Sequence, residues 1–317
     1  METTPPGLPR QQMRRAPEQV MLTGMEGTLI RDFLADSVAR ARVYPRVALD
    51  ALSGGPASEP QMVAYGEHPR QHLLLFSPPE GVRVREVGLF FLHGGGWRSG
   101  DTAGYSFVGR AMAARGFVTA VAGYRLAPAF RFPRQLHDAC SGFAVAQATS
   151  PPAQGGVKRW VVGGFSAGGH LAALVAFADV PRGFLSAQGA AGPSGLLSLA
   201  APLDLSVYGV PRPGTMLHDL LGPGVDPRSA SPLEFVRGGR RPACLLVQGR
   251  RDPHVPAEVA VRFARAVNDG RRPEPAVTME VPWMHHADVA RLFLESLPET
   301  ERIAAWLDAR HGDAAQW

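Results

Sequence analysis

The 317-residue sequence contains only two cysteines and one lysine, and these scarcities exclude classes of protein. Cys140 lies in a predicted helix and Cys244 opens a predicted strand, so we expect two buried, reduced thiols rather than a disulfide framework. Lys158 is the single lysine, and the arginines behind the net charge of +5 form no basic run interleaved with aromatics. The sequence therefore gives no indication of nucleic-acid binding.

Long apolar runs and metal-binding spacings are also missing. No stretch approaches the roughly 20 apolar residues that span a bilayer, and the first residues lack the basic and apolar regions of a signal peptide. Neither His-Glu-x-x-His nor Cys-x-x-Cys occurs, and the glycine-rich segment 163–169 is followed by His170 where a phosphate-binding loop needs a lysine. We therefore expect a cytoplasmic protein with no membrane partner, no metal and no cofactor.

The composition predicts one large globular domain. Apolar residues make up 45% of the chain and charged residues 19%, which suits a single well-buried core. We expect residues 1–17, rich in Pro, Gln and Arg, to form a disordered lead, and residues 18–317 to form one domain. Apolar residues at helical spacing predict a helical segment over 18–43. A stretch rich in Pro, Gly and Ser at 206–241 predicts a small lid insertion.

Strand and helix patterns alternate from about residue 60. The predicted strands are Gln61–Tyr65, His72–Phe76, Val87–Leu92, Phe117–Ala122, Arg159–Gly163, Leu196–Ala201, Ala243–Gln248 and Val277–Val281. The predicted helices are Tyr105–Arg115, Pro133–Ala148, Ala167–Phe177, Pro256–Asn268, Asp288–Ser296 and Glu299–Ala309. Early strands without intervening helices predict an antiparallel lead-in. The later alternation predicts an α/β fold with a mostly parallel sheet of about eight strands, flanked by helices.

The most specific local signal is the segment from Trp160 to His170, where a short apolar strand is followed by Gly-x-Ser-x-Gly and then a helix. Ser166 is at the apex of this turn, and Gly164 and Gly168 let the backbone pass close to itself. Such a turn exposes a serine above the edge of a sheet, and the helix that follows favours a developing negative charge. The pattern therefore predicts that Ser166 is a nucleophile.

A second motif, His93-Gly94-Gly95-Gly96-Trp97, ends the apolar run Val87–Leu92. Consecutive glycines leave backbone N–H groups uncovered, and acyl transfer needs such donors because charge builds on the carbonyl oxygen. We predict an oxyanion hole formed by the amides of Gly95, Gly96 and Ala167. The occurrence of both motifs in this order argues against a merely flexible glycine turn.

A serine nucleophile needs a base that is itself oriented by an acid, and in folds with this turn the chain order is Ser, then Asp or Glu, then His. Asp252 follows the predicted strand 243–248 and is the predicted acid, with Asp204 one strand earlier as the alternative. The base must follow the last strand, where His285 and His286 are adjacent. Neighbouring side chains point in different directions, and we prefer His286 because a helix begins just after it.

Other side chains near these motifs receive lesser roles. We expect His93 to brace the glycine loop, His170 to pack or to bond the backbone, and His254 to lie at the rim. The candidate substrate-binding residues are Trp97, Tyr105, Phe165 and Leu217.

In combination, these motifs resemble the esterase and lipase group of the α/β-hydrolase superfamily, which includes hormone-sensitive-lipase-like esterases, short esterases and kynurenine formamidases. The matching stretches are 93–97 with 99–101, 124–128, Phe132-Pro133 with Asp138, 164–170, Ser231-Pro232 and 249–256. The resemblance implies the α/β-hydrolase fold and cleavage of carboxylic esters through an acyl-enzyme. It also implies that residues 124–128 brace the sheet edge.

The resemblance and the small predicted lid lead us to expect a carboxylic ester of a small or medium acyl or aryl group as substrate. One alternative is an amidase of the arylformamidase type, which would use the same residues with a different pocket. The other is a non-catalytic ligand-binding protein on this fold, although such a protein usually lacks part of the triad. The expected partner is a small-molecule ester or amide, and a homodimer is left open.

Overall fold

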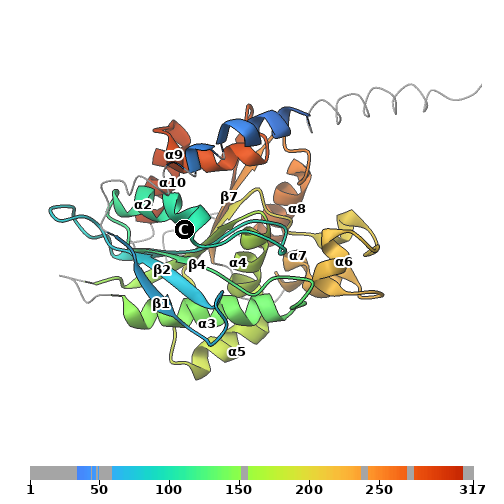
Figure 1. Cartoon of the computed structure of the whole chain (residues 1–317), viewed down its shortest axis with the longest axis horizontal. Helices are drawn as coiled ribbons and strands as arrows, with labels where there is room; N and C mark the ends of the chain where they lie inside the picture. Colours follow the sequence, from blue (N-terminus) through green and yellow to red (C-terminus); the bar gives the residue numbers. More distant parts are fainter. Residues whose placement is uncertain are drawn as a thin grey trace, which may run out of the picture.

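The computed structural model describes residues 34–43, 45–47, 49, 59–150, 156–236, 242–269 and 275–309. Within these residues, eight strands form one sheet in the order β1-β2-β4-β3-β5-β6-β7-β8 (Figure 1). β2 pairs antiparallel with both β1 and β4, and all neighbours from β4 to β8 are parallel. The predicted antiparallel lead-in and mostly parallel sheet are therefore confirmed.

All eight predicted strands are present, with ends within two residues of the prediction. They are β1 (Gln61–Ala64), β2 (His72–Phe76), β3 (Val87–Leu92), β4 (Thr119–Ala122), β5 (Arg159–Phe165), β6 (Gly195–Leu199), β7 (Ala243–Gly249) and β8 (Ala276–Val281). The long helices are α2 (Ser106–Ala113), α3 (Arg134–Thr149), α4 (Ala167–Phe177), α5 (Asp179–Ala187), α8 (Ala257–Asn268) and α10 (Pro298–Asp308). The short ones are η1 (Ala103–Tyr105), η2 (Leu205–Tyr208), α6 (Met216–Leu221), η3 (Pro227–Ala230), α7 (Pro232–Phe235), η4 (Ala287–Ala290) and α9 (Arg291–Leu294).

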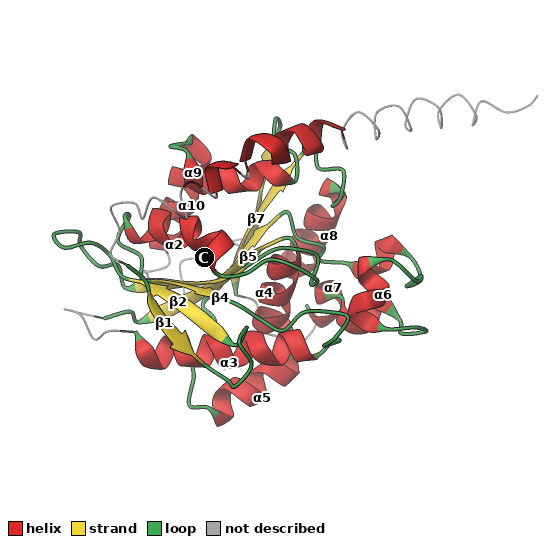
Figure 2. Cartoon of the chain, viewed as in Figure 1, coloured by secondary structure: helices red, strands yellow, loops and turns green. Residues whose placement is uncertain are grey.

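Helices cover both faces of the sheet, as Figure 2 shows. Side chains of a strand alternate between the two faces, and β3 is buried on both. Phe90 and Leu92 join the core shared with α3, α4 and α8, whereas Leu89 and Phe91 join the core shared with α2, α9 and α10. The strand was recognisable in the sequence because burial on both faces makes it a continuous apolar run.

Helix α5 is absent from the sequence prediction. Pro181 and Gly183 lie within it and weaken the helical pattern. Pro181 is in the first turn, where a backbone N–H would have no helical partner, so proline is tolerated there. Buried Leu185 then fixes the helix against the core of α3 and α4. The helix is therefore stabilised by packing that the local sequence does not reveal.

The helical stretch before the sheet and the predicted lid 206–241 are the two segments to compare with the predicted domain division. Residues 34–43 and 45–47 are helical, within or just beyond the predicted segment 18–43, and this stretch lies beside α9 and α10 (Figure 1). The predicted lead 1–17 and residues 18–33 lie outside the described residues. The predicted lid 206–241 carries α6 and α7 at one end of the molecule, and its role stays a prediction.

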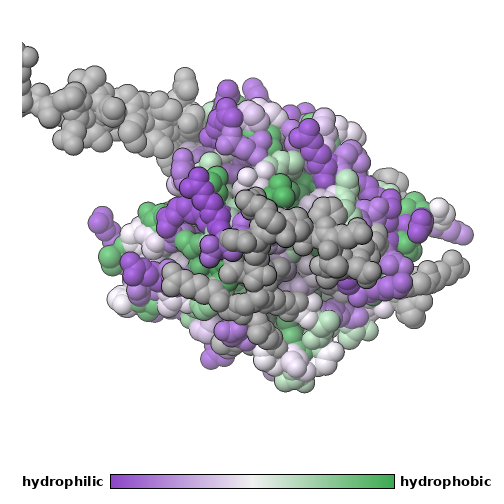
Figure 3. Space-filling model, turned by 180° about the vertical axis from the view of Figure 1, so that it is seen from behind, coloured by the Kyte–Doolittle hydropathy of each residue, from purple (hydrophilic) through white to green (hydrophobic). Residues whose placement is uncertain are grey.

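On the face opposite to that of Figure 1, hydrophilic and hydrophobic residues are interspersed over the described surface (Figure 3). No helix in the described part of the chain is both long and apolar enough to cross a membrane.

Candidate active site

Ser166 occupies the tight turn between β5 and α4 that the sequence predicts. Its backbone has φ 52° and ψ −118°, a conformation that costs free energy for any residue with a Cβ. Glycine is required on both sides of it. A Cβ at Gly164 would collide with the backbone of Gly168, and a Cβ at Gly168 would collide with the carbonyl oxygens of Leu92 and His93. The close crossing with the end of β3 thus holds Ser166 in the strained turn.

Ser166, His286 and Asp252 form a continuous hydrogen-bonded relay. Ser166 Oγ lies 3.0 Å from His286 Nε2, and His286 Nδ1 lies 2.7 Å from Asp252 Oδ2. A carboxylate only accepts hydrogen bonds, so Nδ1 carries the ring proton and Nε2 is free to accept from the serine hydroxyl. The His286 and Asp252 side chains are 10% and 1% exposed. A base shielded in this way can activate a serine hydroxyl.

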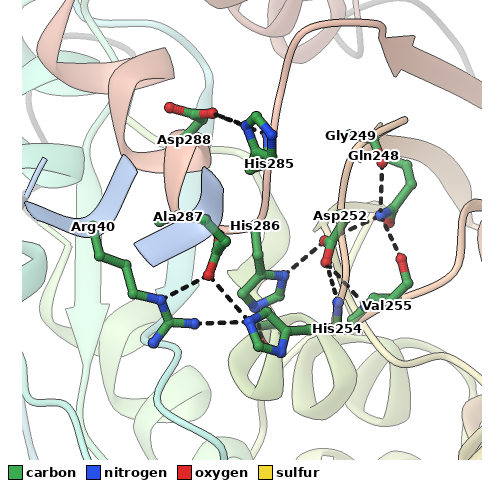
Figure 4. A network of polar contacts seen from close by, with 12 residues as sticks. Arg40, Gln248, Gly249, Asp252, His254, Val255, His285, His286, Ala287 and Asp288 are labelled. Carbon is green, nitrogen blue, oxygen red and sulfur yellow. Dashed lines mark hydrogen bonds and ion pairs between the residues drawn. The ribbon is translucent and has the colours of Figure 1, made fainter. Parts of the chain in front are cut away.

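Asp252 lies in the loop after β7 and accepts hydrogen bonds from several donors (Figure 4). Its Oδ1 accepts from the backbone N–H groups of His254 at 2.8 Å and Val255 at 3.0 Å. Its Oδ2 accepts from Gln248 Nε2 at 3.2 Å in addition to His286. These bonds restrain the carboxylate beside His286 Nδ1.

The two alternative triad residues have other partners. His285 Nδ1 lies 3.1 Å from Asp288 Oδ2, and the same oxygen accepts from the His285 amide at 3.0 Å, away from His286 (Figure 4). Asp204 is buried, caps η2 by accepting from the Ser206 amide, and pairs with Arg262 at 3.0 Å. The structure therefore joins Ser166 to the preferred histidine and the preferred carboxylate.

The glycine loop after β3 lies directly against this serine turn. Gly95 and Gly96 have φ of 124° and 60°, which glycine alone adopts readily. A Cβ at Gly94 would collide with the Phe165 ring, so the loop packs on the residue before Ser166. Within the described part of the chain, the N–H groups of Gly95, Gly96 and Ala167 have no protein acceptor. Three such donors beside the Ser166 hydroxyl could bind an oxyanion.

Two fully buried histidines brace this region without joining the relay. His93 Nδ1 bonds the Gly94 carbonyl at 2.8 Å, and its ring stacks on Tyr124 at 4.2 Å. His170 Nδ1 accepts from Trp97 Nε1 at 3.3 Å, and its Nε2 bonds the Ala230 carbonyl at 2.7 Å. Burial disfavours the charged ring and lowers the pKa of His93 and of His170 to about 4. Both rings are therefore neutral braces at neutral pH.

An apolar pocket opens beside His286. It is lined mainly by aromatic and aliphatic side chains of η1, α2, η4 and α9, with Arg40, Val43 and Val47 contributed by the helical stretch before the sheet. Two of the predicted pocket residues, Tyr105 and Phe165, line it. The other two, Trp97 and Leu217, are buried in the core around α3 and α4 instead.

Sequence reasoning missed the remaining pocket walls. Phe107 and Phe293 look like ordinary core residues in a one-dimensional pattern, and both do belong to a core cluster. Val43 and Val47 lie more than a hundred residues from Ser166 in the chain, so no spacing connects them with the site. Among the described residues, no group of three or more His, Cys, Asp or Glu side chains could hold a metal ion.

Comparisons with known proteins agree with this architecture. A family model described as alpha/beta hydrolase fold matches residues 89–211, which contain the glycine loop and the serine turn but neither Asp252 nor His286. The chain is similar to Esterase LipC of Mycobacterium tuberculosis, at 26% identity over 97% of this chain and 79% of that protein. Arylacetamide deacetylase of Oryctolagus cuniculus is 38% identical over a shorter match that covers 32% of this chain and 27% of that protein.

A solved structure supports the fold. The hyperthermophilic esterase from the archaeon Pyrobaculum calidifontis superposes with a TM-score of 0.61 at 21% identity, covering 86% of this chain and 93% of that one. Identity at this level speaks for the shared fold alone.

Proposed function

Because the chain belongs to the esterase and lipase group of the α/β-hydrolase family and is a carboxylic ester hydrolase, we propose that it is a serine esterase acting on small or medium acyl or aryl esters. One observation carries the proposal. The hydroxyl, imidazole and carboxylate of Ser166, His286 and Asp252 lie in series at 3.0 and 2.7 Å, at the carboxyl end of parallel strands. Ligands of open α/β sheets bind at that edge.

In the proposed reaction, Ser166 Oγ attacks the acyl carbon while its proton passes to His286 Nε2. Asp252 stays ionised and stabilises the imidazolium through Nδ1–H. Collapse of the tetrahedral intermediate breaks the bond to the alcohol oxygen, which leaves with the proton from Nε2. Water then attacks the acyl-enzyme by the same route, releases the carboxylic acid and restores Ser166.

The negative charge on the tetrahedral intermediate would be stabilised by the amides of Gly95, Gly96 and Ala167. Their lack of any protein acceptor in the described residues supports this role, because no hydrogen bond within the protein has to break before they bind the oxyanion. Removing one such donor typically costs about 2.7–4 kcal/mol of transition-state stabilisation. The turn and loop that hold them are backbone structures, so they need little reorganisation.

The pocket beside His286 supports a small apolar or aryl group on the substrate. Tyr105, Phe107, Phe165 and Phe293 give it aromatic walls, and aromatic walls favour planar apolar groups. Similarity to arylacetamide deacetylase agrees with an aryl substrate and keeps amide cleavage as the second candidate, since the relay would serve either bond.

The test is the initial rate of hydrolysis of p-nitrophenyl esters from C2 to C12 by the wild-type protein and by Ser166→Ala. We expect the highest rates with short or medium chains and a loss of at least about a thousandfold in Ser166→Ala. Ser229→Ala, which removes an exposed hydroxyl bonded to a backbone carbonyl, is the matched control and should leave the rate unchanged.

Wild-type rates no higher than those of Ser166→Ala would contradict the esterase proposal. N-formyl aromatic amines would then test the amidase alternative on the same two proteins. Failure of a fluorophosphonate probe to label wild-type Ser166 would instead support the non-catalytic, ligand-binding alternative.

A further inference from the structure

The helical stretch before the sheet sends one carboxylate, that of Asp36, into the region of the relay. Asp36 is only 1% exposed, and its two oxygens have three different kinds of partner. Oδ1 accepts from the Ala287 N–H at 2.9 Å, and Oδ2 lies 2.8 Å from Arg40 Nε and 3.1 Å from His254 Nε2. Burial raises the pKa of Asp36, but the hydrogen bonds from His254, Ala287 and Arg40 outweigh burial and hold the pKa well below its usual value.

We propose that Asp36 is a positioning residue for the relay of Ser166, His286 and Asp252, an inference that rests on the proposed function. The carboxylate contacts none of the reacting atoms. It acts through two neighbours, the backbone that follows the base and the histidine that follows the acid.

The first connection is to the base. Ala287 directly follows His286 and begins η4, and its N–H is one of the donors that a helix leaves without an internal acceptor. Asp36 supplies that acceptor from a segment about 250 residues away in the chain. The peptide unit that carries the His286 side chain toward Ser166 is thereby tied to the helical stretch. A shift of this peptide would move Nε2 relative to the serine hydroxyl.

The second connection is to the acid. His254 Nε2 donates to Asp36 Oδ2 at 3.1 Å, because a carboxylate only accepts. Arg40 Nη2 lies 3.0 Å from the same nitrogen, and the His254 backbone N–H bonds Asp252 Oδ1 at 2.8 Å (Figure 4). Its ring also packs edge-on against the His286 ring, with centroids 5.0 Å apart. One buried carboxylate therefore restrains the loops of both the acid and the base. Side chains that reach the same apolar pocket, Val43 and Arg40, come from the same helical stretch.

The competing explanation is that Asp36 only anchors the helical stretch to the domain and adds stability. The two explanations differ in what a substitution changes. An anchor affects unfolding, and loss of a pocket wall raises KM. A positioning residue lowers kcat, because a misplaced base costs rate even in the bound complex.

The decisive variant is Asp36→Asn, which keeps the size of the side chain. Its carbonyl can still accept from Ala287, but its NH₂ faces the donors of Arg40 and His254. We expect kcat on p-nitrophenyl esters to fall at least about tenfold with KM within about twofold. The rate constant for labelling of Ser166 by a fluorophosphonate should fall in parallel, because the base activates the serine there too.

Asp138→Asn is the matched control. Asp138 is also 1% exposed, and it accepts from the backbone amide and the guanidinium of Arg125 and from Gln71 Nε2. Among the described residues, it has no bond to the loops of His286 or Asp252. It should lose thermal stability while kcat stays within about twofold of wild type. If Asp36→Asn behaves like Asp138→Asn, Asp36 is an anchor and the inference is overturned. A rise in KM alone would also overturn it.

His254→Gln provides an independent arm and covers the case in which Asp36→Asn does not fold. The His254 side chain is 29% exposed, and its backbone bond to Asp252 is kept. We expect kcat to fall about threefold in His254→Gln. The double variant with Asp36→Asn should lose no more kcat than Asp36→Asn alone, because both substitutions disrupt the same contact. An unchanged kcat in His254→Gln would contradict the second connection. An unchanged kcat in both His254→Gln and Asp36→Asn would contradict the whole inference. Absence of Ser166-dependent hydrolysis by the wild type would contradict the proposed function instead.

Discussion

The two halves of the site are built from different materials. The half that holds Ser166, the proposed nucleophile, and the amides without an acceptor among the described residues is shaped by glycines in two short motifs at 93–97 and 163–169. The half that holds His286 and Asp252, the proposed base and acid, is a network of side chains from the helical stretch, the loop after β7 and the loop after β8. In the first half, each motif has a conformation that its own glycines permit, and the close backbone crossing between the two motifs fixes it. In the second half, the arrangement depends on side-chain contacts among three segments that are distant in the chain. Substitutions should therefore fail differently in the two halves.

The largest difference is expected between the adjacent histidines. His286→Asn should lower kcat by about 10³-fold or more, because it removes the imidazole that contacts Ser166 and is proposed as its base. His285→Asn should lower kcat less than tenfold, since the bonds of His285 within the described residues go to Asp288 in its own loop. Steady-state rates on one short p-nitrophenyl ester measure both. Comparable losses in the two variants would mean that the loop, rather than one imidazole, controls the reaction.

A rigid backbone crossing should make the first half intolerant of a single methyl group. Gly168→Ala places a Cβ against two backbone carbonyls at the end of β3, and backbone cannot move aside as a side chain can. We expect about a hundredfold loss of kcat from the displaced Ala167 amide and destabilisation of about 1–3 kcal/mol in urea unfolding.

The matched control is Gly183→Ala in α5, where a Cβ meets nothing within 4 Å. It should stabilise the protein by up to about 1 kcal/mol and leave kcat unchanged, because alanine favours a helix over glycine. Wild-type activity in Gly168→Ala would show that the crossing is less rigid than the distances imply.

Acid should lower the free energy of unfolding through the two buried histidines of the first half, His93 and His170. The pKa values of His93 and His170 are about 4 in the folded protein and 6.5 in the unfolded chain, so the unfolded state binds more protons as the pH falls from 6.5 to 4. Each should remove about 2 kcal/mol of stability by pH 5. Urea unfolding at pH 7.5 and 5.0 measures this loss. Between these pH values, the free energy of unfolding of His170→Gln should fall by about 2 kcal/mol less than that of the wild type. An equal loss would mean that His170 is already charged in the folded protein.

The smallest effect is expected at the rim. Met216 in α6 covers Gly96, since a Cβ at Gly96 would collide with its sulfur, and yet it is 45% exposed. Met216→Ala should change KM for medium-chain esters about twofold to threefold with kcat and melting temperature nearly unchanged. Val210→Ala is the control, because Val210 lies in the same predicted lid and is 72% exposed. It should leave KM, kcat and the melting temperature unchanged. Equal effects in both variants would remove the reason to assign α6 to the rim of the site.

Much of this fold could be predicted because its signals are local. A continuous apolar run such as Val87–Leu92 must be buried on both faces, and a serine between glycines after such a run can adopt the strained turn. Helix α5 escaped prediction because Pro181 and Gly183 hide its pattern, while the packing of Leu185 stabilises it. The walls of the pocket could not be predicted, because the local sequence around Phe107 and Phe293 does not distinguish them from core residues.

By itself, the sequence determined the serine turn and the glycine loop, because each is encoded within a few neighbouring residues at 160–170 and 93–97. It also predicted the class of fold from the alternation of strand and helix patterns along the chain, and the chain order of the candidate triad from the positions of Ser166, Asp252 and His286. Only the tertiary structure places His286 rather than His285 beside Ser166, and Asp252 rather than Asp204 beside His286, because those contacts depend on how the packed loops turn their side chains. The same holds for Asp36, whose place beside the relay follows from the docking of a helix rather than from any spacing along the chain.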